Sequence, residues 1–138
     1  MAMTSIGTAV PTETAYGQIL NTKTVAQETA PVAMDTERIV RSYFQDIPVM
    51  VQIARCESTF RHTLLDGSVL KGAVDPADTG VMQINKRYHA KTAAAMSLDL
   101  DDIYQNMAYA RHLYETQGTR PWSASAPCWN KGTLAMNI

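Results

Sequence analysis

The sequence lacks a long run of hydrophobic residues and an excess of charge of either sign. No apolar stretch in its 138 residues approaches the roughly 20 residues of a membrane-spanning helix. Lysines and arginines number 12 against 13 aspartates and glutamates, and there is no polybasic run. The composition therefore predicts no membrane span and no nucleic-acid binding, and the length suits one domain with one core.

Cysteine and histidine are also scarce. Cys56 and Cys128 are the only cysteines, and the three histidines, His62, His89 and His112, are spread along the chain. These residues do not have the spacing of zinc ligands, so we predict no metal site. The cysteines could be two buried free thiols. We favour a disulfide, which would close a loop of about 70 residues and imply an oxidising compartment.

Composition divides the chain into three parts. Residues 1–34 are rich in threonine and alanine and poor in large hydrophobic residues, which is typical of a flexible leader or linker. The folded domain is expected at 35–130, followed by a C-terminal tail at 131–138. The first six residues lack the charged and apolar regions of a signal peptide, so we expect either a removed leader or another route out of the cell.

Local signals predict a mostly α-helical domain. An Asp35 or Thr36 cap predicts a helix to about residue 44, and Pro48 suits the first turn of a helix to about 59. Two more helices are expected at 86–96 and from 103 to Gly118, capped by Asn85 and by Asp101 or Asp102, with a short turn or helix at 122–129. The run 64–70 surrounds Asp-Gly and is typical of a β-hairpin.

Glu57 occupies an unusual position on the second predicted helix. Residues three, four and seven apart share a helix face, and Glu57 continues the apolar stripe formed by Met50, Val51 and Ala54. A carboxyl in an apolar environment has a raised pKa and can keep its proton near neutral pH, as a general acid must. The alternatives are a solvated glutamate near a helix end and a buried structural carboxylate.

Three motifs in order resemble the lytic transglycosylase and goose-type lysozyme group. Residues 56–60 read Cys-Glu-Ser-Thr-Phe, residues 80–85 read Gly-Val-Met-Gln-Ile-Asn, and residues 104–114 read Tyr-Gln-Asn-Met-Ala-Tyr-Ala-Arg-His-Leu-Tyr. The resemblance covers about residues 36–129 and implies a lysozyme-like fold, with helices and one small β-hairpin beside a sugar-binding cleft. Residues 122–129, Trp-Ser-Ala-Ser-Ala-Pro-Cys-Trp, depart from the Ala-x-x-x-Tyr-Asn-Ala-Gly stretch that is usual in the soluble transglycosylases.

The resemblance also implies roles for individual residues. Glu57 would be the catalytic acid, and Gln83 would bind the sugar through its amide, while Met82 and Ile84 point into the core. The other expected substrate contacts are Ser58, Asn85, Asn106 and Tyr109. Asn106 and Tyr109 lie three apart on a helix stripe that could edge the cleft, and the alternative for Ser58 is a residue that only ends its helix.

The sequence leaves open whether a second carboxylate takes part in the reaction. Most glycosidases use two, and Asp75 and Asp78 lie in the loop after the predicted hairpin, far enough along the chain for either to supply it from across the cleft. Both also stand in ordinary turn sequences, Asp-Pro and Asp-x-Gly. Proteins of the resembling group often use a single acid, with the substrate's N-acetyl oxygen in place of the second carboxylate.

We therefore expect a peptidoglycan-cleaving enzyme that acts on the β-1,4 bond between N-acetylmuramic acid and N-acetylglucosamine. Lytic transglycosylation by Glu57 alone would give a 1,6-anhydro product and needs no cofactor or metal. A hydrolytic muramidase is the alternative, and a non-catalytic glycan-binding module on the same fold is another. The expected partner is the peptidoglycan glycan strand, the expected location is outside the cell or in the cell envelope, and a monomer is assumed.

Overall fold

The computed structural model describes the backbone of residues 31–137, and the side chains of residues 35–131. From Ala33 onward the described residues form one compact unit. The predicted leader at 1–34 lies almost entirely outside the described residues. Its last four residues belong to the first helix that the structure describes, which begins before the predicted Asp35 or Thr36 cap.

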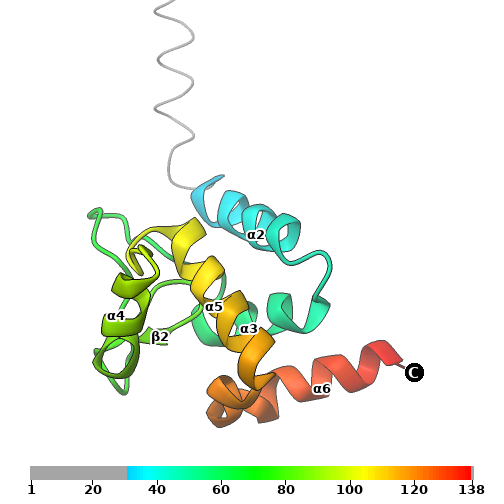
Figure 1. Ribbon diagram of the computed structural model, residues 1–138. Helices are drawn as coiled ribbons and strands as arrows, with labels where there is room; N and C mark the ends of the chain where they lie inside the picture. Colours follow the sequence, from blue (N-terminus) through cyan, green and yellow to red (C-terminus); the bar gives the residue numbers. More distant parts are fainter. Residues whose placement is uncertain (1–30, 138) are drawn as a thin grey trace, which may run out of the picture. The chain divides into compact units, whose positions relative to one another are not determined.

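The described part of the chain is mostly α-helical with one small antiparallel sheet, so this level of the fold prediction is confirmed (Figure 1). In chain order the elements are α2 (Pro31–Tyr43), α3 (Pro48–Ser58), β1 (Asp78–Thr79), β2 (Ile84–Asn85), α4 (Lys86–Ala95), α5 (Ile103–Gln117), the 3-10 helix η2 (Arg120–Ser125) and α6 (Ala126–Asn137). Among residues 31–137, no helix is both long enough and apolar enough to cross a membrane.

Helix ends follow the local signals in the sequence. Pro48 opens α3, where its missing N–H costs no hydrogen bond. The side chain of Asn85 accepts a hydrogen bond from the Arg87 backbone N–H and caps α4. Asp102 rather than Asp101 caps α5, by accepting from the Gln105 backbone N–H, and Gly118 ends it.

The predicted hairpin at 64–70 is a tight turn with a single bridge between Thr63 and Val69. The two-stranded sheet lies further along the chain, where Asp78 pairs with Asn85 and Thr79 with Ile84. A hairpin ladder needs apolar side chains that are buried on one face, and Leu65 in the first turn is 87% exposed. The expected C-terminal tail at 131–138 also differs, because α6 continues to Asn137.

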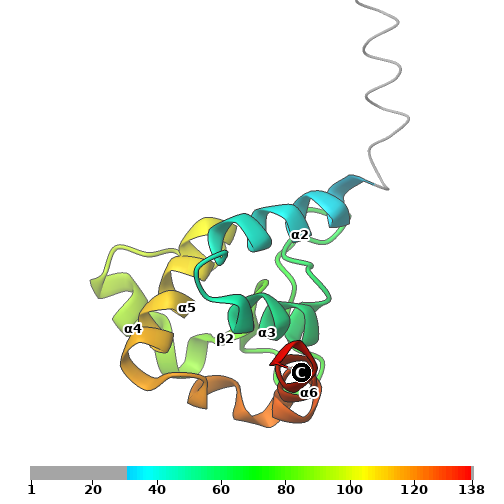
Figure 2. The same cartoon turned by 90° about the vertical axis from the view of Figure 1, so that its right-hand side faces the viewer.

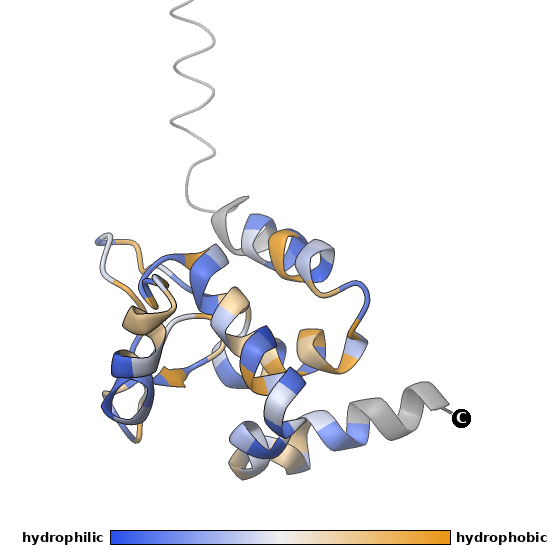
Figure 3. Cartoon of the chain, in the orientation of Figure 1, coloured by the Kyte–Doolittle hydropathy of each residue, from blue (hydrophilic) through white to orange (hydrophobic). Residues whose placement is uncertain are grey.

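The core lies where α3 and α5 meet η2, α6 and the turn between the two strands (Figure 2). Its largest fully buried side chains include Phe44, Met50, Ile53, Met82 and Met107. Figure 3 shows hydrophobic residues where α3 begins and hydrophilic residues on the exposed turns of α4. Met107, Ala110 and Leu113 form the buried face of α5.

Arg111 connects α5 to the turn between α2 and α3. Its guanidinium donates two hydrogen bonds to the Asp46 carboxylate, at 2.8 and 3.0 Å, and a third to the Tyr43 carbonyl. It also lies over the rings of Tyr43 and Phe44. This pairing lowers the pKa of Asp46 and fixes the end of α2 on the middle of α5.

Candidate functional site

Glu57 lies in the last turn of α3 and is half-buried, as its place on the apolar stripe predicts. Burial raises the pKa of its carboxyl, the nearby charge of Asp78 raises it further, and a hydrogen bond from Ser125 works in the opposite direction. The net pKa shift is upward. The direction is the one that a general acid requires.

The backbone immediately after Glu57 is strained. Thr59 and Phe60 both have positive φ, at 54° and 56°, which is rare for residues with a β-carbon. The αL conformation of Thr59 ends α3, and its N–H bonds back to the Arg55 carbonyl. Phe60 is 7% exposed, so burial of its ring holds this sharp turn in place. This turn therefore fixes where α3 stops, one residue after Glu57.

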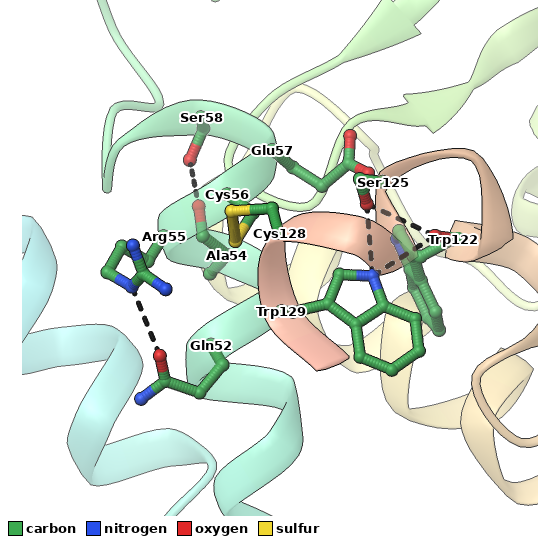
Figure 4. The surroundings of a disulfide bond; sticks show 10 residues. All are labelled: Gln52, Ala54, Arg55, Cys56, Glu57, Ser58, Trp122, Ser125, Cys128 and Trp129. Carbon is green, nitrogen blue, oxygen red and sulfur yellow. Dashed lines mark hydrogen bonds between the residues drawn. A yellow bond between two sulfur atoms is a disulfide. The ribbon is translucent and has the colours of Figure 1, made fainter. Parts of the chain in front are cut away.

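Ser125 approaches Glu57 from the other side of the site, at the end of η2 (Figure 4). Its hydroxyl donates a 2.6 Å hydrogen bond to Glu57 Oε1. The Trp129 indole N–H reaches both Ser125 Oγ and the Trp122 carbonyl, at 3.1 Å each. Trp122 is 3% exposed and donates its indole N–H to the Met82 carbonyl, so it seals the core.

The predicted disulfide between Cys56 and Cys128 is present and joins α3 to α6. It stands next to Glu57 in sequence on one side and three residues after Ser125 on the other. Figure 4 shows the Glu57 and Ser125 side chains pointing toward one another beside this bond. The alternative of two buried free thiols is wrong.

The turn between β1 and β2 carries Gly80 and Gln83. Gly80 has φ +75°, and a β-carbon there would lie 2.6 Å from both Asn106 Nδ2 and His62 Cε1. His62 is buried and holds the turn by accepting from the Val81 N–H, while its other ring nitrogen bonds to the Asp101 carbonyl. Only glycine fits at position 80, because both the dihedral angle and the space exclude a side chain.

Gln83 is half-buried, whereas Met82 and Ile84 on either side are buried, as predicted. Its φ is +51°, and its Nε2 donates a hydrogen bond to the Gly80 carbonyl. Among the described residues, the Gln83 side-chain amide makes this one hydrogen bond. The bond leaves the side-chain oxygen Oε1 and the second amide hydrogen available. An amide held in a strained turn with donor and acceptor capacity to spare is suited to bind a ligand.

Asn106 is fully buried on α5, which does not fit the predicted sugar contact. Its Oδ1 accepts from the Met82 N–H, and its Nδ2 donates to the Thr79 and Leu100 carbonyls. The amide therefore uses both donors and positions the turn that holds Gln83. The prediction made Asn106 a substrate contact, but the stripe of α5 that carries Asn106 and Tyr109 is buried.

Tyr109 and Ser58 are likewise interior residues. Tyr109 is 1% exposed, and its hydroxyl lies 2.9 Å from His89 Nδ1 on α4, so it joins two helices. Ser58 is 1% exposed and donates to the Ala54 carbonyl within α3. In Figure 4 its side chain points away from Glu57. Ser58 is therefore the helix-end serine of the alternative, and Tyr109 is a core residue and not the expected substrate contact.

Asn85 and Asp75 form a structural cluster. The Asn85 Nδ2 donates to Asp75 Oδ2 and Asp78 Oδ1, at 2.9 Å each, while its Oδ1 caps α4. Asp75 also accepts the Ala77 N–H and a two-armed ion pair from Arg87, and these bonds lower its pKa. The Asp75 carboxylate is thus engaged in these structural bonds. Of the two candidate carboxylates, Asp78 is the one whose charge acts on Glu57.

Sequence reasoning missed Ser125, Trp129 and His62 as members of this region. Ser125 lies in the stretch that departs from the resembling families, so no motif identified it. The one available signal was the nearness of Ser125 to Cys128, since a disulfide to Cys56 brings its neighbours to Glu57. One surface pocket of about 180 Å³ lies between the end of α2 and the start of α3, and another of about 330 Å³ lies between α2 and Tyr104; neither is lined by Glu57.

Within the part of the chain that the structure describes, no group of three or more His, Cys, Asp or Glu side chains is arranged to hold a metal ion. No protein-family model, no curated protein and no solved structure matches this chain.

Proposed function

We propose that this protein is a peptidoglycan-cleaving enzyme with a lysozyme-like fold, in which Glu57 is the general acid and base. The observation that carries the proposal is the environment of Glu57. It is a half-buried carboxyl with a raised pKa at a strained helix end, hydrogen-bonded to Ser125. The order of its three sequence motifs supports the choice of the bond between N-acetylmuramic acid and N-acetylglucosamine as the substrate.

The proposed reaction is lytic transglycosylation with a single acid. Protonated Glu57 gives its proton to the glycosidic oxygen, and the bond from that oxygen to the muramic C1 breaks. The substrate's N-acetyl oxygen stabilises the positive charge that develops at C1. The ionised Glu57 then takes the proton of the muramic 6-hydroxyl as its oxygen attacks C1. The product is a 1,6-anhydro sugar, no water is consumed, and Gln83 is the proposed amide contact to the substrate.

Hydrolysis is a second candidate because the charge of Asp78 acts on Glu57. In this variant Asp78 would stabilise the cationic centre or orient a water molecule, as a second carboxylate does in most glycosidases. Asp78→Asn separates the two mechanisms. It should abolish hydrolysis, whereas single-acid transglycosylation should continue, with Glu57 titrating at a lower pH once the Asp78 charge is removed.

The disulfide favours a protein that works outside the reducing cytosol. We accordingly propose a secreted or cell-envelope location, which agrees with a peptidoglycan substrate.

The test is mass spectrometry of the products released from purified peptidoglycan. Wild type is compared with Glu57→Gln, which removes the proton and keeps the shape, and with Glu115→Gln, which makes the same change at an exposed position of α5. Anhydromuropeptides from wild type and Glu115→Gln but not from Glu57→Gln are the expected result. Reducing-end products, heavier by one water, would establish the hydrolase. Glycan binding without any product from wild type would refute the enzyme and leave a binding module.

A further inference from the structure

Three hydrogen-bonding groups converge on one hydroxyl beside the candidate acid. Ser125 Oγ lies 2.6 Å from Glu57 Oε1, 3.1 Å from the Trp122 carbonyl and 3.1 Å from the Trp129 indole nitrogen. The indole N–H can only donate, and the carbonyl can only accept. Ser125 therefore accepts from Trp129 and has a single proton to share between Glu57 and Trp122.

The distances indicate where that proton goes. The 2.6 Å between Ser125 Oγ and Glu57 Oε1 is typical of a hydrogen bond from a hydroxyl to a carboxylate. The 3.1 Å between Ser125 Oγ and the Trp122 carbonyl oxygen is long for a hydroxyl donor. Ser125 thus donates to Glu57, and the hydrogen bond occupies Oε1. When Glu57 binds a proton, Oε2 is the oxygen that can carry it without displacing the Ser125 hydroxyl.

We propose that Ser125 is a positioning residue for the reaction at Glu57, holding Oε1 as an acceptor so that Oε2 carries the proton delivered to substrate. The effect of Ser125 on the reaction rests on the proposed function. The hydrogen bond between Ser125 and Glu57 does not, because it is present in the folded protein without substrate. Ser125 contacts neither a reacting atom nor the substrate in this scheme and acts only through Glu57.

Two features hold Ser125 in place. Trp129 is 7% exposed and anchors the hydroxyl through its indole N–H. The disulfide at Cys128 fastens the start of α6 to α3 beside Glu57. A side chain held from both directions loses little additional freedom when it binds the carboxylate, which is what precise orientation of an acid requires.

The charged neighbours of Glu57 are few among the described residues. Asp78 of β1 acts on Glu57 through its charge and disfavours ionisation. On α3 itself, Arg55 donates to Gln52 and points away from the carboxyl (Figure 4). From α6 the disulfide sulfurs carry no proton. Ser125 is the group described here that favours the ionised form of Glu57, since its hydrogen bond lowers the pKa.

The experiment compares Ser125→Ala, Ser125→Thr and the matched control Ser123→Ala, an exposed serine on the same 3-10 helix. The first readout is the pKa of Glu57. It is measured from the carbon-13 NMR signal of the Glu57 side-chain carboxyl as a function of pH, which needs no substrate. Ser125→Ala should raise this pKa, Ser125→Thr should restore it because it keeps the hydroxyl, and Ser123→Ala should leave it unchanged.

The second readout is the pH profile of peptidoglycan cleavage. Ser125→Ala should lower the maximal rate by about 100-fold, through loss of orientation, and move the basic limb of the profile to higher pH. Ser125→Thr should recover most of the rate. An unchanged Glu57 pKa in Ser125→Ala overturns the inference. A raised pKa in a protein whose wild type cleaves nothing supports the contact and refutes only the proposed reaction.

Discussion

Removal of the Cys56–Cys128 disulfide is the perturbation whose effect can be worked out most directly. The bond joins residues 72 apart in sequence and is the covalent link between α3 and α6. Without it the unfolded chain gains conformational freedom, whereas the noncovalent contacts of the folded state remain. The double substitution Cys56→Ala/Cys128→Ala removes the bond and leaves no free thiol.

The expected loss follows from the length of the closed loop. In the chain-entropy model a loop of 72 residues stabilises the folded state by about 4 kcal/mol at 25 °C. For a domain of this size, a loss of that order lowers the melting temperature by roughly 20 °C. A domain with a typical total stability of about 5–15 kcal/mol would still fold at 25 °C.

The assay is urea unfolding at pH 7, followed by circular dichroism, of wild type and the double variant with and without reductant. Reductant should lower the stability of wild type to that of the double variant and should not change the double variant. A loss below about 1 kcal/mol would refute the entropic argument. A reductant effect on the double variant would show that the reagent acts elsewhere.

Three further predictions concern the turn and the candidate acid. Gly80→Ala should lower the unfolding free energy by more than about 3 kcal/mol, and Gly67→Ala by only about 1 kcal/mol. Both glycines have positive φ, but of the two only Gly80 is enclosed by neighbouring atoms. A similar loss in both variants would contradict the packing argument. Asn106→Ala should cost about 3 kcal/mol, since it leaves buried N–H and carbonyl groups unpaired, while Asn130→Ala on the exposed side of α6 should cost less than about 0.5. Glu57→Gln should unfold at a higher urea concentration than wild type at pH 7. The folded-state pKa of Glu57 is raised, so wild type loses stability as the pH rises through that pKa. The difference in unfolding free energy between the two proteins should vanish below about pH 4. Equal stability of Glu57→Gln and wild type at pH 7 would mean that burial of Glu57 is not costly.

The sequence by itself determined where most helices begin and end. Pro48, Asn85, Asp102 and Gly118 act on backbone groups within one helical turn, so their effects can be read without knowledge of the fold. The inward direction of Glu57 was also predictable, because helical periodicity places it on the stripe that α3 buries. The burial of Met82 and Ile84 on either side of Gln83 followed from the same kind of local pattern.

Only the tertiary structure decided which polar residues are free to meet a ligand. Asn106 and Tyr109 share a stripe of α5 whose burial depends on the elements packed around that helix, and both are interior. The two candidate aspartates have similar turn sequences, yet Arg87 binds Asp75, whereas the charge of Asp78 acts on Glu57. The bond from Ser125 to Glu57 spans 68 residues. Such contacts depend on how helices pack, which local hydrogen bonding and periodicity do not specify.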